Sequence, residues 1–237
     1  MISRIEAALI EARSDGVEML VFPECFLTGY YMDAAEVPKV AVEISESVLE
    51  QLQSLSDATQ VAFVLGSYRL VSGGVANTAF VFRPDSHTPI TYDKRALYGA
   101  WEKSVFQAGR SPLLFEHKGV TFAVLICFDV EFPELVREAA RLGAQAVLVP
   151  TALMAPDHWV TDFMVPSRAL ENNVTLAYAN RIGTEDHLTF IGKSQLCDSD
   201  PARRIIASET DSGLIAFDLQ KHAGATDYIA ELKDIAT

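Results

Sequence analysis

Two stretches of this 237-residue chain repeat one layout, and that layout restricts the folds open to the chain. Each runs from the end of a predicted helix through a glycine turn into a short apolar segment closed by proline. The stretches are EARSDGVEMLVFPE, residues 11–24, and EAARLGAQAVLVPT, residues 138–151. A short apolar run between turn residues is typical of a strand buried on both faces. The repeat therefore predicts helices that alternate with buried strands, as in α/β proteins.

The two copies differ in what precedes them. A further apolar strand over residues 120–126 precedes the second copy, which makes a strand–helix–strand unit. The first copy begins directly at a helix, predicted from Ile2 to Gly16. Either the repeat is imperfect, or a first strand of about half a dozen residues is missing from this sequence. We favour the second interpretation, under which one sheet has an edge with unpaired backbone groups.

The rest of the chain continues the alternation, with paired strands between the helical units. Strands 61–65 and 75–82 are joined through Ser72-Gly73-Gly74, as in a hairpin. This pattern favours mixed sheets covered by helices. No linker rich in Pro, Gly and Ser divides the chain, so we expect a single domain over residues 1–237. The other predicted elements are helices over 44–58, 133–142 and 161–171, strands over 19–22, 146–149, 174–179, 189–196 and 214–218, and a helical pattern over 226–237.

Composition and charge exclude several classes of function. With 49% apolar and 22% charged residues, the chain is globular rather than disordered. Its net charge of −13 argues against nonspecific binding to nucleic acid or to anionic membranes. No apolar run reaches the roughly 18 residues of a membrane span, and the N-terminus lacks the basic-then-apolar layout of a signal peptide. We therefore expect a soluble, cytoplasmic protein with no nucleic-acid or membrane partner.

The cysteines and histidines do not form a metal-binding pattern. Cys25, Cys127 and Cys197 are widely spaced, so they form neither a disulfide framework nor a CxxC pair for zinc. The five histidines are scattered, and the chain has no glycine-rich nucleotide-binding motif. We expect no metal and no cofactor.

Three reactive side chains each follow directly on a predicted strand. Glu24 follows MLVFP, Lys94 follows ITYD, and Cys127 follows VTFAVLI. In open α/β sheets, the loops after the strands aim side chains into one shared crevice. Singly, each residue has a plainer explanation: a solvated turn, a surface lysine and an inert core thiol. Jointly, with their flanking residues, they predict a catalytic site.

Those flanking residues resemble the nitrilase, or carbon–nitrogen hydrolase, superfamily. The resemblance rests on FPECFLTGY (22–30), YDKRALYGAWEKSVFQAGR (92–110) and LICFDVEFPELVRE (125–138), supported by ANRIG (179–183) and IGKSQL (191–196). It covers nearly the whole chain in the family's order. It implies a four-layer α-β-β-α sandwich of two mixed sheets with helices outside. Members of the family open with a strand before their first helix, which supports the interpretation that the N-terminus is short.

The resemblance also implies a mechanism. Cys127 would be the nucleophile, Glu24 the general base, and Lys94 the cation at the developing oxyanion, helped by the backbone N–H of Phe128. A free thiol is mostly protonated at neutral pH, so it needs such a base. The thiol would attack the amide carbon, ammonia or an amine would leave, and water would hydrolyse the resulting thioester. Cys25 lacks the flanking residues of the nucleophile and is expected to pack against the sheet.

Four further residues near these motifs are candidates for supporting roles. Glu102, eight residues after the lysine, corresponds to a second glutamate that orients the substrate amide or supports the lysine in many family amidases. Its alternative is a surface glutamate. Tyr30 and Glu131 are candidates for the substrate pocket, and Asp129 and Glu131 could orient loops. Their alternatives are a packed aromatic ring and local salt bridges.

The motifs shared across the superfamily do not name the substrate. LYGAWEKSVFQAGR (97–110) and PTALM (150–154) look most like small-molecule carboxamide amidases, including those that act on amino-acid amides. We therefore expect hydrolysis of a small linear or amino-acid carboxamide to a carboxylate and ammonia. N-carbamoyl amine hydrolysis comes second, since only His158, with Arg168 further on, could bind a substrate carboxylate there. Nitrile hydrolysis comes third, because the short chain looks unlike typical nitrile hydrolysers.

The assembly and a non-enzymatic alternative also follow from the resemblance. Family members usually form dimers, so a homodimer or a higher homo-oligomer is expected. The helical pattern over 226–237 could reach across to the second subunit of such a dimer. The non-enzymatic alternative is an inactive homologue, truncated at its N-terminus, that only associates with other subunits. The intact Glu24, Lys94 and Cys127 argue against this alternative.

Overall fold

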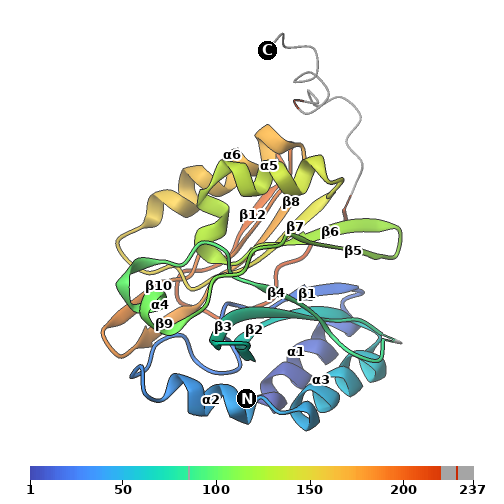
Figure 1. Cartoon of the computed structure of the whole chain (residues 1–237). Helices are drawn as coiled ribbons and strands as arrows, with labels where there is room; N and C mark the ends of the chain where they lie inside the picture. Colours follow the sequence, from blue (N-terminus) through green and yellow to red (C-terminus); the bar gives the residue numbers. More distant parts are fainter. Residues whose placement is uncertain (85, 220–227, 229–237) are drawn as a thin grey trace.

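The computed structural model describes residues 1–84, 86–219 and 228, and the described chain is built in four layers (Figure 1). Two β-sheets pack face to face, and helices cover the outer face of each sheet. Both sheets contain parallel and antiparallel pairs of strands. The predicted α-β-β-α sandwich of two mixed sheets is therefore confirmed.

The first sheet has four strands, whose order across the sheet follows the sequence. Its first two strands are parallel, and the remaining neighbours are antiparallel. Ser72 and Gly73 alone join the second strand to the third, because Val71 pairs with Gly74. This confirms the predicted hairpin. The strands are β1 (Met19–Val21), β2 (Ala62–Val71), β3 (Gly74–Phe82) and β4 (Ile90–Asp93).

Both faces of the first sheet are buried, and this explains its continuous apolar strands. Successive side chains of a strand point to opposite faces. In β2, Phe63 and Leu65 pack against helices α1 (Ile2–Ser14) and α3 (Glu46–Thr59), whereas Val64 belongs to the core between the sheets. A strand between two apolar layers thus needs apolar residues at nearly every position.

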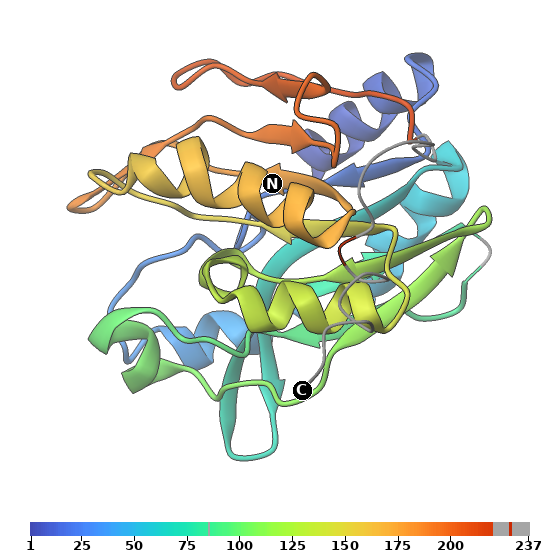
Figure 2. The same ribbon diagram turned by 90° about the horizontal axis from the view of Figure 1, so that it is seen from above.

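The second sheet has six strands, of which the three central ones are parallel. Helices α5 (Pro133–Arg141) and α6 (Val165–Asn172) lie side by side across its outer face (Figure 2). They bury Val136, Ala139 and Ala169 in the core of this sheet. In order across the sheet, the strands are β12 (Arg204–Ile206), β11 (Gln195–Cys197), β8 (Thr175–Ala179), β7 (Ala146–Pro150), β6 (Val120–Val124) and β5 (Leu113–His117).

The layout repeated in the sequence corresponds to α1–β1 and to α5–β7. Gly16 and Gly143 follow the two helices with φ of +76° and +100°, a conformation that glycine adopts without strain. In the second unit, β6 lies parallel beside β7. In the first unit, β1 pairs with β2 on one side, and no described strand lies on its other side. Strand β1 is therefore an edge strand of the described sheet.

The strand predicted over 189–196 is wrong as a single element. Gly192 and Lys193 both adopt positive φ, and the chain turns there. The residues before the turn form β10 (Leu188–Ile191), which pairs with β9 (Ile182–Glu185) in a separate hairpin. The residues after the turn enter the second sheet as β11.

Two predictions near the C-terminus have different outcomes. Residues 214–218 form no strand. Leu214 instead packs against the core between the first sheet and helices α1 and α3. The helical pattern over 226–237 lies outside the described residues, apart from Tyr228.

The predicted helices are present at the expected positions, but their ends and their helix types differ in part. The helix predicted over 161–171 begins one residue earlier as a π-helical turn and continues as α6. The short helices over 37–43 and 99–105 were not predicted from the sequence. None of the described helices is long and apolar enough to cross a membrane. The remaining helical elements are α2 (Val37–Glu43), α4 (Gly99–Val105), the 3-10 helix η1 (Cys127–Glu131) and the π-helical turn η2 (Val160–Met164).

Candidate active site

The three side chains singled out in the sequence lie together between the two sheets. Glu24, Lys94 and Cys127 follow β1, β4 and β6, and all three are buried. Lys94 Nζ donates a hydrogen bond to Glu24 Oε1 at 2.8 Å. The thiol of Cys127 lies beside this pair, within electrostatic range of both charges. The strand ends thus bring together a thiol, a carboxylate and an ammonium.

The loop that carries Glu24 rests directly on the backbone of β2. A Cβ added at Gly66 would lie 2.4 Å from the Cys25 nitrogen and 2.7 Å from the Glu24 Cα, so only glycine leaves room. On its other side, the Glu24 N–H donates to the Thr151 carbonyl of the second sheet at 3.3 Å. Arg181 donates to the Cys25 carbonyl at 3.1 Å. The Glu24 loop is therefore held from one side by β2 and from the other by the segments that follow β7 and β8.

Glu102 is buried, so the alternative of a surface glutamate is wrong. Its Oε1 accepts hydrogen bonds from Lys94 Nζ at 2.6 Å and from the Tyr30 hydroxyl at 2.7 Å. Its Oε2 accepts the Tyr98 N–H at 2.7 Å. Lys94 thus lies between two carboxylates, and both oxygens of Glu102 are engaged.

Only one carboxylate oxygen of Glu24 accepts hydrogen bonds, whereas both oxygens of Glu102 do. Its Oε1 accepts hydrogen bonds from Lys94 and from Asn77 Nδ2, the latter at 2.7 Å. Its Oε2 is buried and has no hydrogen-bond partner among the described residues. Burial raises the pKa of the Glu24 carboxyl, and Lys94 offsets only part of that effect. Sequence reasoning missed Asn77, although an amide inside the apolar run of β3 is a signal, because buried polar groups need partners.

Burial alone would lower the pKa of Lys94, but the two carboxylates hold it well above its ordinary value. Lys94 is therefore a permanent cation. For Cys127, burial raises the pKa of the thiol well above its ordinary value, and the Glu24 carboxylate raises it further. The opposing effects of Lys94 and of the Ala152 N–H are smaller. The resting thiol is therefore protonated.

Cys127 occupies a conformation that favours glycine. Its φ is +46°, in the left-handed region, at the start of η1. A residue with a side chain pays roughly 1–2 kcal/mol there, and the surrounding contacts must offset that cost. The bend places the buried thiol at the end of β6, beside Glu24 and Lys94.

Asp129 provides contacts that hold this bend. Its Oδ1 accepts the backbone N–H groups of Ala96 at 2.7 Å and Arg95 at 3.2 Å, in the loop after β4. Its Oδ2 accepts the Ile126 N–H at 3.0 Å and the Tyr92 hydroxyl at 2.8 Å. Asp129 forms no ion pair among the described residues. Of its two predicted roles, the orientation of loops therefore agrees with the structure, and a local salt bridge does not.

The structure places the remaining candidates around this centre. Tyr30 is buried, and its ring lies 5.7 Å from that of Trp101, between ring centroids. The ring of Phe128 contacts those of Tyr98 and Phe132, with centroids 5.2 and 5.0 Å apart. The second group of rings adjoins Cys127, because Phe128 is the next residue in the chain.

Glu131 ends η1 and is half-buried. Burial and the nearby carboxylate of Asp157 raise the pKa of Glu131 to about 7. Arg168 donates to the Glu131 carbonyl at 2.9 Å, while its ion pair is made with Glu171. Neither Glu131 nor Asp157 forms a salt bridge within the described part of the chain. The local salt bridge considered for Glu131 is therefore not present there.

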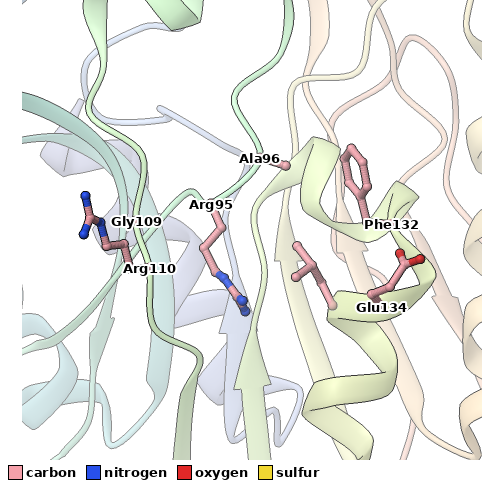
Figure 3. A pocket seen from close by; sticks show the side chains of 7 residues that line it. Arg95, Ala96, Gly109, Arg110, Phe132 and Glu134 are labelled. Atoms are coloured by element: carbon pink, nitrogen blue, oxygen red, sulfur yellow. The ribbon is translucent and has the colours of Figure 1, made fainter.

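A pocket of about 420 Å³ lies beside the loop after β4 (Figure 3). In Figure 3, Arg95 and Arg110 border one side, and Phe132 and Glu134 border the other. Arg95 pairs with Glu138 of α5. Glu24, Lys94 and Cys127 do not line this pocket. Among the described residues, no group of three His, Cys, Asp or Glu side chains could hold a metal ion. The lining residues are Arg95, Ala96, Gly109, Arg110, Phe132, Glu134 and Leu135.

Known proteins share this sequence pattern. The family model of carbon-nitrogen hydrolases matches residues 1–228. An (R)-stereoselective amidase from a Pseudomonas species is 32% identical over 198 residues, which cover 83% of this chain and 71% of the amidase. A nitrilase from Pyrococcus abyssi is 31% identical over 236 residues, which cover 98% of this chain and 88% of the nitrilase.

A solved structure shares the fold as well. An amidase of the nitrilase superfamily from Nesterenkonia sp. AN1 superposes with a TM-score of 0.86 at 32% identity, over 98% of this chain and 89% of that one. In that structure, a variant of the amidase carries the acetamide moiety of fluoroacetamide covalently bound at its active-site cysteine. The present chain therefore belongs to the carbon–nitrogen hydrolase family, in the nitrilase superfamily, and is a hydrolase of carbon–nitrogen bonds other than peptide bonds.

Proposed function

We propose that this chain hydrolyses small carboxamides, with Cys127 as nucleophile, Glu24 as general base and Lys94 as oxyanion partner. The observation that carries the proposal is the buried carboxylate–ammonium–carboxylate group beside a protonated thiol. Burying two carboxylates and one ammonium is costly, and a merely structural site could do without them. The group makes chemical sense where a thiol must lose a proton and an oxyanion must be stabilised.

The first half of the reaction forms a thioester. Glu24 takes the proton of the Cys127 thiol, and the sulfur attacks the amide carbon. The carbonyl oxygen becomes an oxyanion, which accepts hydrogen bonds from Lys94 and from the Phe128 N–H. Lys94 has three N–H groups and uses two on carboxylates, so one remains for the oxyanion. When the C–N bond breaks, Glu24 returns the proton to the leaving nitrogen, and ammonia departs.

The second half regenerates the enzyme. Glu24 takes a proton from water, and the hydroxide attacks the thioester carbon. The same donors stabilise the second oxyanion. The C–S bond breaks, the proton returns to the Cys127 sulfur, and a carboxylic acid is released. Throughout, Glu102 keeps Lys94 protonated, because its Oε1 accepts a hydrogen bond from Lys94 Nζ at 2.6 Å. The Tyr98 N–H binds Oε2 and holds the Glu102 carboxylate in this position.

Among carboxamides, amides that carry an ammonium group fit the site best. Asp157 acts electrostatically on Tyr98, and the Tyr98 ring contacts the Phe128 ring edge-on, next to the nucleophile. Glu131 acts electrostatically on Asp157 and on the same tyrosine. The Asp157 carboxylate, together with Glu131, which is partly ionised near pH 7, attracts a cationic substrate and repels an anionic one. This favours amino-acid carboxamides over N-carbamoyl amino acids, which carry a carboxylate.

We expect ammonia release from alaninamide and from its neutral isostere isobutyramide, with a higher kcat/KM for alaninamide. Glu131→Gln should lower kcat/KM for alaninamide by about tenfold, about 1.4 kcal/mol, and leave isobutyramide nearly unchanged. The matched control is Glu134→Gln, three residues further on at an exposed position of α5. Steady-state ammonia assays decide the outcome.

N-carbamoylalanine and propionitrile belong in the same assay. If either is turned over faster than both amides, the carboxamide proposal is wrong. If no compound is turned over and Cys127 resists alkylation, the inactive-homologue alternative holds. The Pyrococcus abyssi relative, a nitrilase, is the reason for including the nitrile.

We also propose that the chain forms a homodimer through the outer layer over the second sheet. Trp159, Phe163 and Leu170 follow one another at helical spacing along η2 and α6, and they are 50%, 70% and 39% exposed. Such an apolar stripe marks an association surface. Sedimentation at micromolar protein should give a dimer, and Phe163→Asp should shift it toward the monomer. A monomeric wild-type chain would contradict this.

The cytoplasm is the compartment we propose. The three cysteines are all free in the structure, as expected in a reducing compartment.

A further inference from the structure

Asn77 joins three segments of the candidate site. It is fully buried in β3, among apolar and small neighbours. Its Nδ2 donates to Glu24 Oε1 at 2.7 Å, and its Oδ1 accepts the Cys25 thiol at 3.5 Å. Its backbone carbonyl accepts the Lys94 N–H at 2.9 Å. One residue thus contacts the loops that carry both the base and the ammonium.

The orientation of the Asn77 amide follows from its neighbours. A carboxylate oxygen only accepts hydrogen bonds, so the NH₂ group must face Glu24. The thiol of Cys25 donates to the opposite side of the amide, to Oδ1. A flipped amide would place its oxygen against the carboxylate and lose both hydrogen bonds.

The Asn77 contact makes the two oxygens of Glu24 unequal. Oε1 accepts hydrogen bonds from both Asn77 and Lys94, at 2.7 and 2.8 Å. Oε2 is buried and has no partner among the described residues. An oxygen whose charge is stabilised by two donors binds a proton less readily than one without donors. Oε2 is therefore the more basic of the two oxygens.

We propose that Asn77 is a positioning residue for the reaction: it fixes the rotation of the Glu24 carboxylate and leaves Oε2 as the oxygen that receives protons. The proposal rests on the proposed function of Glu24 as general base. Asn77 contacts Glu24 and not the substrate, so its effect appears in proton transfer more than in substrate binding.

The sign of the expected pH effect follows from the hydrogen bond. Asn77 donates to the ionised form of Glu24 and so lowers the pKa of that carboxyl. Removing the donor raises this pKa, and the acidic limb of the kcat/KM profile moves to higher pH. The other titratable groups that act on Glu24 are unchanged in sequence: Lys94, Glu102, Cys25, Cys127, Arg181 and the hydroxyls of Tyr30, Tyr68 and Tyr178.

Two variants separate positioning from packing. Asn77→Ala removes the donor and leaves a small cavity, whereas Asn77→Asp keeps the shape and replaces the donor by an acceptor. We expect kcat to fall by roughly 10- to 100-fold in Asn77→Ala, with KM little changed, and to fall further in Asn77→Asp. The acidic limb should move upward in the same order. A purely structural role predicts the reverse order, because aspartate fills the space.

Thr78→Val is the matched control. Thr78 is the next residue of β3, is equally buried, and donates its hydroxyl to Asp93 at 2.6 Å on the other face of the strand. This variant should lower thermal stability without moving the acidic limb. The readouts are the pH profiles of kcat/KM and of Cys127 alkylation by iodoacetamide, since alkylation remains measurable when turnover is slow.

The outcomes distinguish this inference from the proposed function. If the wild-type chain turns over no amide and Cys127 is not alkylated, the proposed function fails. If the wild type is active but both Asn77 variants keep its acidic limb, or if Asn77→Asp outperforms Asn77→Ala, the positioning role is overturned and the proposed function stands.

Discussion

Replacing Cys127 by serine is expected to lower kcat for carboxamides by at least about 10³-fold while the protein stays folded. Serine has almost the shape of cysteine, so it fits the left-handed bend at the start of η1 as well as cysteine does. Its hydroxyl is a far weaker acid than a thiol, so Glu24 cannot supply enough nucleophile. Ammonia release and thermal unfolding, measured on the same samples, test this expectation.

Alkylation identifies the reactive sulfur independently of turnover. Iodoacetamide should modify Cys127 of the wild type, with mass spectrometry of peptides as the readout. Cys25→Ser and Cys197→Ser are the matched controls, since both thiols are also buried and free. If Cys127→Ser retains most of the activity, or if labelling moves to Cys25, another nucleophile carries the reaction.

Replacing Lys94 by methionine should have the largest effect on stability. Glu24 and Glu102 would remain buried without their shared cation, and breaking a buried ion pair costs roughly 3–5 kcal/mol. Burial already raises the pKa of the Glu24 carboxyl, and without Lys94 this carboxyl would keep its proton up to a still higher pH in the folded protein than in the unfolded chain. Stability then falls as the pH rises, because the unfolded state releases that proton first. Chemical unfolding at pH 5 and pH 8 should show a greater loss at pH 8.

A double variant provides the control for Lys94→Met. Adding Glu102→Gln removes one of the uncompensated charges, so part of the lost stability should return. Activity should not return, because the oxyanion still lacks its cation. Equal stability of Lys94→Met and wild type at pH 8 would show that Lys94 does not hold the two carboxylates.

The local parts of the fold follow from the sequence, and the non-local parts do not. The helix–glycine–strand units are predictable because Gly16 and Gly143 mark helix ends and the following runs are apolar. The apolar run over 214–218 has the composition of a strand, yet Leu214 packs on a core built from distant helices. Whether such a run pairs with a sheet depends on free edges elsewhere in the fold, which local sequence does not encode.

The same division applies to the candidate site. Glu24, Lys94 and Cys127 are recognisable because each follows a strand within a distinctive motif. Asn77 is not, since its contact with the base depends on the pairing of β3 with both β2 and β4. The signal that remains in the sequence is a lone amide within an apolar strand, which shows that a polar partner exists without naming it.

The carboxylate of Asp129 has a consequence for how substrate reaches the thiol. It fastens the loop after β4 and the loop before η1 through four hydrogen bonds, so the two loops behave as a single rigid wall. Lys94 stands at the start of the first of these loops, and Cys127 begins η1 directly after the second. The ammonium and the thiol therefore keep their spacing when substrate enters, because the segments that carry them are tied to one carboxylate.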